Sequence, residues 1–113
     1  MKLTDLTPEQ KRIAIAEACG YVNVHKFDKW KEGGPMRDGT LIGDETGKRP
    51  RRRAYIPDYL NDLNAMHEAE KTLTAEQWHE YDRLMPLRDP QKIHATAAQR
   101  ADAFLLATGR ATV

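Results

Sequence analysis

Three stretches of the chain combine a helix-start signature with apolar residues at helical spacing. Each opens with a threonine that is followed three residues later by a glutamine, at Thr7, Thr74 and Thr96. In this capping box, the threonine hydroxyl and the glutamine side chain each satisfy a backbone N–H at the helix start. Glycine or proline stops each pattern. We therefore predict three helices, over about 8–19, 75–85 and 97–108.

The middle one of these helices places Trp78, Tyr81 and Leu84 or Met85 on one side. Helical spacing of aromatic residues is typical of a core face, and an exposed face for a partner is the alternative. Pro57-Asp58 opens a fourth helical pattern, predicted over roughly 58–72. Its inward stripe is expected to contain Leu60, Leu63 and Met66 or His67.

Two other segments predict strands. Residues 21–27 are rich in aromatic and β-branched side chains, and residues 51–56 end in an apolar Ala-Tyr-Ile closed by Pro57. Between them, residues 31–47 contain five glycines and one proline. This stretch fits either a ragged hairpin around Asp38-Gly39 or a flexible loop, and we favour the loop for at least half of it. The predicted fold is α+β, with about four helices packed on a small sheet.

Composition fits one domain spanning residues 1–113, with residues 31–50 as its loop or ragged hairpin. The chain is 40% hydrophobic and 31% charged, which is a globular rather than a disordered composition. Its single cysteine, Cys19, excludes an internal disulfide and suits a reducing compartment. No apolar run reaches the roughly 18 residues of a membrane span, and the first residues lack the apolar stretch of a secretory signal. We expect a cytoplasmic protein without membrane contact.

Charge is distributed unevenly along the chain. Residues 1–56 carry 12 Lys and Arg against 8 Asp and Glu, a net charge of +4. Residues 57–113 carry 6 against 9, a net charge of −3. A chain with this asymmetry can present a basic face to a partner without being a general polyanion binder.

The densest group of cations is the basic run, Lys48, Arg49, Arg51, Arg52 and Arg53. These five residues are the candidate partner-binding site. Three interpretations stay open for the basic run: contact with an acidic protein surface, contact with nucleic acid phosphates, and a solvated edge that blunts strand pairing. If residues 51–53 form a strand, Arg52 faces opposite to its two neighbours.

No constellation in the sequence points to catalysis, a cofactor or a metal. Residues 43–48 resemble a phosphate-binding loop, but the glycine spacing is one residue short and Arg follows the Lys. The four histidines lie on four different elements, without partners at metal-ligand spacing. The carboxylates of the fourth predicted helix, at positions 58, 62, 68 and 70, fit a solvated face and the helix dipole. We expect a protein that is not an enzyme.

Two segments resemble a known family. They are PDYLNDLNAMHEAEKTLT at residues 57–74 and IHATAAQRADAFL at residues 93–105, and residues 6–20 are similar to the same family's first helix. Together these blocks, about 45 residues, resemble the phage ABA-sandwich domain, a family of small phage and prophage proteins. The resemblance implies a layered α-β-α sandwich and a phage context, and it supplies no catalytic residue. The sequence departs from the family between residues 30 and 53.

The resemblance and the small size of the chain together suggest a function. Small accessory phage proteins commonly bind and block a host factor. We therefore expect a non-enzymatic interaction protein in the cytoplasm of a bacterial host, with a defence complex as one such target. The alternative is an accessory protein that binds nucleic acid through the basic run.

Overall fold

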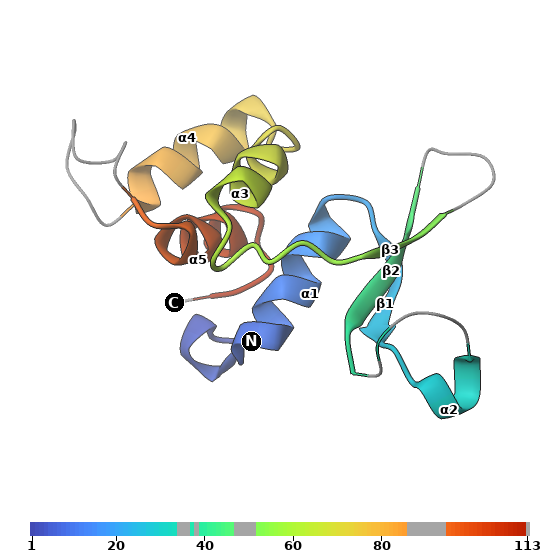
Figure 1. The fold of residues 1–113 in the computed structure, drawn as a ribbon. Helices are drawn as coiled ribbons and strands as arrows, with labels where there is room; N and C mark the ends of the chain where they lie inside the picture. Colours follow the sequence, from blue (N-terminus) through green and yellow to red (C-terminus); the bar gives the residue numbers. More distant parts are fainter. Residues whose placement is uncertain (34–36, 38, 47–51, 86–94, 113) are drawn as a thin grey trace.

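The computed structural model describes residues 1–33, 37, 39–46, 52–85 and 95–112. Figure 1 shows the sheet at one end of the molecule and most of the helices at the other, with α1 between them. The elements run in the order η1 (Leu3–Asp5), α1 (Pro8–Ala18), β1 (Val22–Lys26), α2 (Lys29–Glu32), β2 (Leu41–Glu45), β3 (Arg52–Tyr55), α3 (Leu63–Glu70), α4 (Ala75–Leu84) and α5 (Ala97–Ala107).

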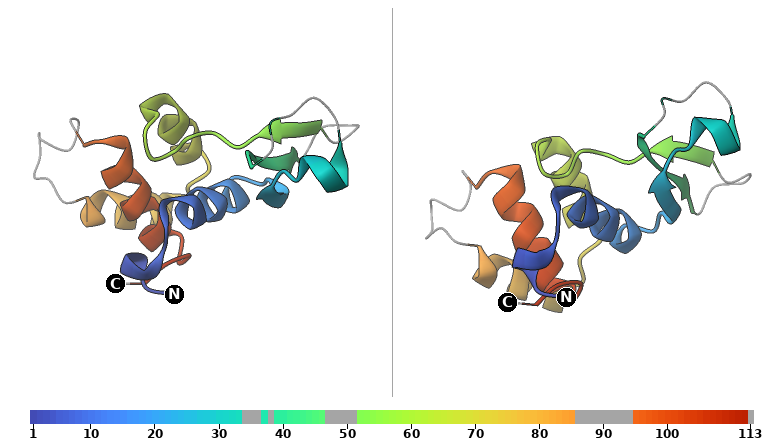
Figure 2. Two further views of the ribbon diagram at one scale, coloured as in Figure 1. Left: turned by 60° about the horizontal axis from the view of Figure 1, so that its bottom comes forward. Right: turned by 90° about the horizontal axis from the view of Figure 1, so that it is seen from below.

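The α+β fold predicted from the sequence is confirmed. Helix α1 packs on β1 on one side and on α5 on the other, so the layers run from the sheet through α1 to the C-terminal helices. Both views of Figure 2 show this segregation of helices from the antiparallel sheet, which is typical of α+β proteins. The ends of the chain lie together, because Leu3 N donates to Thr112 O at 2.7 Å.

The three predicted capping boxes are all present. Thr7, Thr74 and Thr96 each accept a hydrogen bond from the backbone N–H three residues later, and the glutamine there accepts one from the threonine N–H. These contacts are local in sequence, which explains why α1, α4 and α5 begin at the predicted residues. Gly20, with φ of 101°, follows α1 in the left-handed conformation expected of a helix stop.

The sheet has the strand order β1-β2-β3, with both pairs antiparallel. Residues 41–45 form its central strand, so this part of the glycine-rich stretch is a strand and not a loop. Its partners are β1 and β3, not a strand within residues 31–37, and residues 29–32 form α2 instead. Gly43 lets the strands pack closely there, because a Cβ at this position would lie 3.0 Å from Ile56 Cδ1 and 3.1 Å from Val24 Cγ2, and those side chains would have to shift. Residues 34–36, 38 and 47–50 of the predicted loop lie outside the described residues.

The main core lies where α1, α3, α4 and α5 meet. Tyr81, Phe104, Ile15 and Met66 are fully buried there. Of the predicted aromatic face on α4, Tyr81 is therefore core, whereas Trp78 stays 45% exposed. Among the described helices, none is long and apolar enough to cross a membrane.

The prediction of a helix over 58–72 is wrong at its start, because α3 begins at Leu63. Asp58 begins a separate turn, in which its backbone oxygen accepts hydrogen bonds from Asn61 N and Asp62 N. The Asp62 carboxylate then caps α3 by accepting from Asn64 N at 3.0 Å. This shift changes the inward face: Ala65, Met66 and Ala69 are buried, whereas Leu63 is 39% exposed and His67 is exposed.

Candidate functional site

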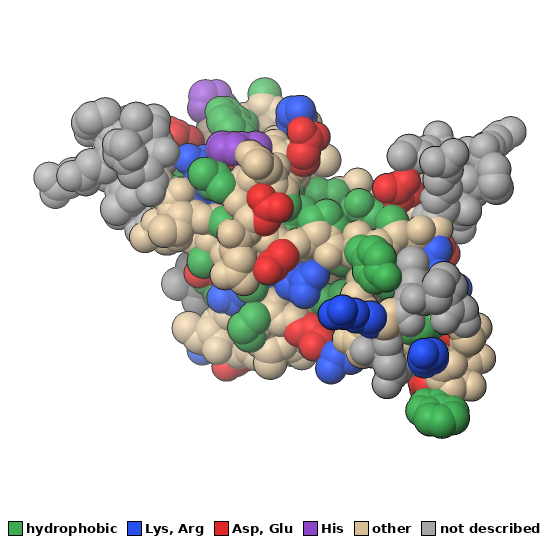
Figure 3. Space-filling model, in the orientation of Figure 1, with side chains coloured by type: hydrophobic (Ala, Val, Ile, Leu, Met, Phe, Trp, Pro, Cys, Tyr) green, Lys and Arg blue, Asp and Glu red, His purple; other side chains and the backbone are tan. Residues whose placement is uncertain are grey.

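The short helix α2 presents the most exposed large hydrophobic side chain among the described residues. Trp30 is 94% exposed, compared with 53% for Tyr55 and 45% for Trp78. Lys29 and Lys31 flank Trp30 on α2, and a hollow lined by Lys26, Phe27, Asp28, Trp30 and Gly39 lies beside it. Figure 3 shows hydrophobic surface projecting at the end of α2, with Lys and Arg side chains nearby. Tryptophan is enriched at protein–protein interfaces relative to the rest of the protein surface.

Hydrogen bonds at the start of α2 hold the backbone of Trp30 in place. The Asp28 carboxylate accepts from Trp30 N at 3.0 Å and from Lys31 N at 3.3 Å. In return, Glu32 Oε2 accepts from Asp28 N at 2.9 Å. This reciprocal capping gives a four-residue helix a defined geometry without a buried face. The tryptophan is thus displayed on a fixed turn.

Glu32 also ties α2 to the sheet. Its Oε1 lies 2.9 Å from His25 Nε2 on β1 and 3.6 Å from Arg53 Nη2 on β3. The hydrogen bond with the Asn23 carbonyl, followed by that with Glu32, raises the pKa of His25 above its ordinary value. The bond from Asp28 N and the contact with His25 lower the pKa of Glu32. We call Lys26, Lys29, Trp30, Lys31 and Arg53 the α2 surface.

The basic run is placed only in part. Arg52 and Arg53 belong to β3, where their Cα partners on β2 are Glu45 and Asp44. Lys48, Arg49 and Arg51 lie outside the described residues. Of the predicted binding residues, Arg53 is thus the one whose side chain the structure places, beside α2.

Sequence reasoning missed Trp30 and Glu32. The available signal was the Lys-Trp-Lys triplet of residues 29–31. Between Trp30 and the glycines that follow, no other hydrophobic residue occurs at helical spacing. A tryptophan that no apolar residue follows at such spacing lacks a continued helix face on which to be buried.

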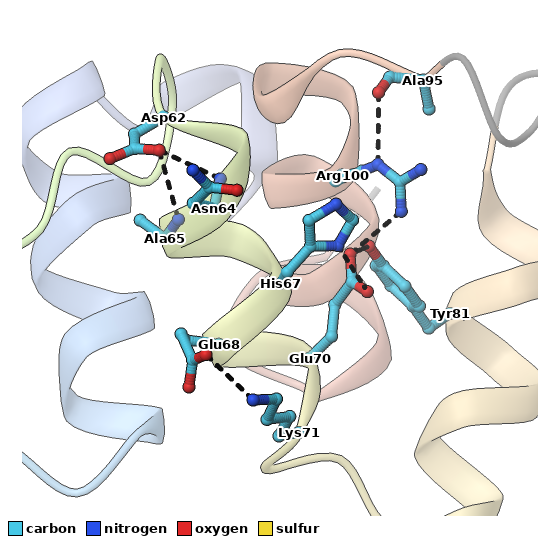
Figure 4. A network of polar contacts seen from close by, with 10 residues as sticks. All are labelled: Asp62, Asn64, Ala65, His67, Glu68, Glu70, Lys71, Tyr81, Ala95 and Arg100. Carbon is cyan, nitrogen blue, oxygen red and sulfur yellow. Dashed lines mark hydrogen bonds and ion pairs between the residues drawn. The ribbon is translucent and has the colours of Figure 1, made fainter.

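A second polar cluster, drawn in Figure 4, joins the three C-terminal helices. Glu70 Oε1 accepts from Tyr81 Oη at 2.7 Å and from Arg100 Nη1 at 3.0 Å, and His67 Nδ1 lies 3.5 Å from Glu70 Oε2. The Glu70 and Arg100 side chains are each only 10% exposed. The prediction that Glu70 lies on a solvated face is therefore wrong, because α3 turns this carboxylate toward Arg100 on α5.

This cluster is built to hold helices together. Arg100 Nε also donates to the Ala95 carbonyl at 3.2 Å, which fixes the chain just before α5. Burial, and then the hydrogen bond with Glu70, raise the pKa of Tyr81, so its hydroxyl stays protonated and donates. Each charged group thus has a partner, as stability requires of charges removed from water.

Two neighbouring hollows lie where the sheet meets the helices, and both are lined by Cys19 and Tyr21. One, of about 180 Å³, also touches Glu45 and Thr46 at the end of β2. The other, of about 320 Å³, extends along Tyr59 and α3. Burial raises the pKa of the Cys19 thiol, and its hydrogen bond with Tyr59 offsets part of that effect. A protonated thiol is a poor nucleophile, so these hollows hold no activated cysteine.

The histidines stay separate among the described residues. His25 lies on β1, His67 on α3 and His79 on α4, and His94 falls outside the described residues. Within the described part of the chain, no three His, Cys, Asp or Glu residues are grouped so that they could hold a metal ion.

Comparison with known proteins adds no assignment to this geometry. No family model, curated protein or solved structure matches this chain.

Proposed function

We propose that this chain is a non-enzymatic interaction protein that binds an acidic partner protein through the α2 surface. The observation that carries the proposal is the 94% exposure of Trp30 on a turn fixed by hydrogen bonds. Tryptophan and arginine are enriched among the residues that dominate binding energy at protein interfaces. An indole displayed in this way gains by entering an apolar pocket of a partner.

The cations around Trp30 select the charge of that partner. Lys29 and Lys31 are the chain neighbours of Trp30 on α2, and Lys26, which pairs with Glu9 at 3.2 Å, lines the same hollow as Trp30. Complementary charge accelerates encounter and disfavours wrong partners. We therefore propose a partner whose binding pocket has an acidic rim. The resemblance to phage proteins favours a host factor that is blocked by this contact, and a component of a defence complex is the most specific form of the proposal.

A second candidate function is binding of single-stranded nucleic acid. It is favoured by the same pairing of an exposed aromatic ring with lysines, because bases stack on such rings while cations contact phosphates. The two functions differ in the dependence of binding on salt and nuclease. Phosphate contacts release counterions, so binding of nucleic acid would weaken steeply as salt is added.

The test is capture of partners from a lysate of the bacterial host by the tagged full chain, with and without nuclease. A stoichiometric protein that survives nuclease treatment and is lost with Trp30→Ala supports the proposal. The matched control is Trp78→Ala, which removes a half-exposed tryptophan from a different helix. Lys29→Glu with Lys31→Glu should also abolish capture, whereas Lys71→Glu on the far side should not.

Two results would contradict the proposal. Capture of a protein that is unaffected by Trp30→Ala would remove the α2 surface from the interface. Recovery of nucleic acid that depends on Trp30 and disappears with nuclease would establish the second candidate instead.

A further inference from the structure

We propose that the outer edge of β3 accepts an extended acidic segment of the partner as a fourth strand of the sheet. This inference rests on the proposed protein-binding function and names a second contact for the same partner. Sheet order β1-β2-β3 leaves β1 and β3 as the edges, and among the described residues no strand pairs with the outer side of either. Addition of a strand to such an edge is a recurrent mode of peptide recognition.

The register shows which backbone groups are available. Ile56 N donates to Leu41 O at 3.0 Å, so the N–H of Ile56 points toward β2. Because backbone groups alternate sides along a strand, Ala54 also points toward β2, whereas Arg53 and Tyr55 direct their N–H and C=O groups outward. Two residues thus offer two donors and two acceptors to an incoming strand.

The other edge is unsuited to strand addition. The pairing of β1 with β2 shifts register between Val22 and His25, and Asn23 has a φ of 54°. In addition, the Asn23 carbonyl lies 2.7 Å from His25 Nδ1. A bulge of this kind bends an edge and prevents regular pairing. By contrast, β3 keeps an unbroken register with β2 over four successive pairs.

The side chains of β3 select the occupant. Arg53 and Tyr55 are two residues apart and share a face of the sheet. Arg53 is 42% exposed on its side chain while it contacts Glu32, and a guanidinium with five N–H donors can take a second carboxylate. Tyr55 is 53% exposed. Cross-strand pairing therefore favours an acidic residue opposite Arg53 and a β-branched or aromatic residue opposite Tyr55.

The same charges disfavour a second copy of this chain as the occupant. Pairing two β3 strands in the register that sets Arg53 opposite Arg53 of the second copy would place like charges opposite each other, which destabilises a sheet. The excess of cations in residues 1–56 adds to this repulsion between copies. Neither of these charge repulsions applies to an acidic strand from another protein.

The test is amide hydrogen exchange of the ¹⁵N-labelled full chain, measured by NMR with a capped synthetic peptide that repeats Glu-Thr-Val-Thr. At nine-tenths occupancy, exchange at Arg53 and Tyr55 should slow by about tenfold. Exchange at Ala54, already bonded to β2, should stay unchanged. The charge-reversed peptide, which repeats Lys-Thr-Val-Thr, should give no effect. Arg53→Pro, which removes an outward donor, should abolish the slowing at Tyr55, whereas Arg53→Gln should weaken it.

Failure of this inference is separable from failure of the proposed function. No slowing at Arg53 and Tyr55 with millimolar peptide would overturn strand addition, and so would slowing that appears instead at Asn23. Slowing that grows with protein concentration in the absence of peptide would replace it by self-association. If capture from lysate still depends on Trp30 in these cases, the proposed binding through the α2 surface is kept and the addition of a fourth strand is rejected.

Discussion

The hydroxyl of Tyr81 on α4 donates a 2.7 Å hydrogen bond to the carboxylate of Glu70 on α3, and Arg100 on α5 donates to the same carboxylate oxygen at 3.0 Å. One oxygen atom, Glu70 Oε1, thus joins three helices. Removal of a buried ionic partner leaves the others unsatisfied, which is more costly than the net gain from forming the pair. Substitutions in this cluster therefore test how strongly the three C-terminal helices are held together.

Glu70→Ala should lower the free energy of unfolding by about 3 kcal/mol, because it leaves the Arg100 guanidinium buried without its carboxylate. The matched control is Glu68→Ala on the same helix. Glu68 contacts Lys71 at 2.9 Å, but both side chains are more than 70% exposed, so the cost should be under about 0.5 kcal/mol. Urea unfolding followed by circular dichroism measures both. Equal effects would show that Glu70 does not hold the helices together.

Arg12→Met should destabilise the fold by about 1–2 kcal/mol. Arg12 on α1 donates to the carbonyl of Ile56 at 2.7 Å and to that of Pro57 at 3.3 Å, which ties α1 to the segment leaving the sheet. Met keeps most of the apolar volume and removes the donors. Lys11→Met is the control, since Lys11 loses only a partly exposed ion pair with Asp102. Thermal unfolding should give a lower Tm for the Arg12 variant than for the Lys11 variant.

Trp30→Ala should leave stability within about 0.5 kcal/mol of the parent chain, since its side chain is almost entirely in water. Trp78→Ala should cost about 1 kcal/mol or more, because this half-exposed ring packs at 5.2 Å between ring centroids against Tyr81. Chemical denaturation of the two variants makes the comparison. A large loss for Trp30→Ala would mean that the indole packs on the protein rather than serving a partner.

His25 gives a prediction for pH dependence. Its pKa in the folded chain is raised, so the protonated imidazole stabilises the folded state. That contribution is fully present below the ordinary pKa of 6.5 and is lost as pH rises through the raised value. NMR titration of the His25 ring should give a pKa above 6.5, and Glu32→Gln should lower it because the neutral amide stabilises the imidazolium less. An unchanged titration in Glu32→Gln would exclude the contact between them.

Much of the local structure was readable from the sequence. The three capping boxes predicted the starts of α1, α4 and α5, because each box is closed by contacts between residues three apart. The same reasoning from residues close in sequence predicted the wrong start for α3. Two aspartates four residues apart, Asp58 and Asp62, are both acceptable at a helix start, and the structure uses the first for a turn and the second as the cap.

The candidate site was less predictable. The sequence drew attention to the basic run, of which the structure places the side chain of Arg53 alone, whereas Trp30 passed without notice. Exposure of a tryptophan depends on which segments pack against it, and that is a property of the assembled chain. The placement of Glu32 between His25 and Arg53 has the same origin, because these residues meet only when both edge strands are in register with β2.

The sequence by itself thus determined the α+β class and the starts of three helices, since caps and periodicity act within a few residues. Tertiary structure decided the rest: the central position of β2, the burial of Glu70 against Arg100, and the exposed position of Trp30. These depend on contacts between residues far apart in the chain. Sheet register and the pairing of buried charges follow from packing of the whole core, which no short pattern of residues encodes.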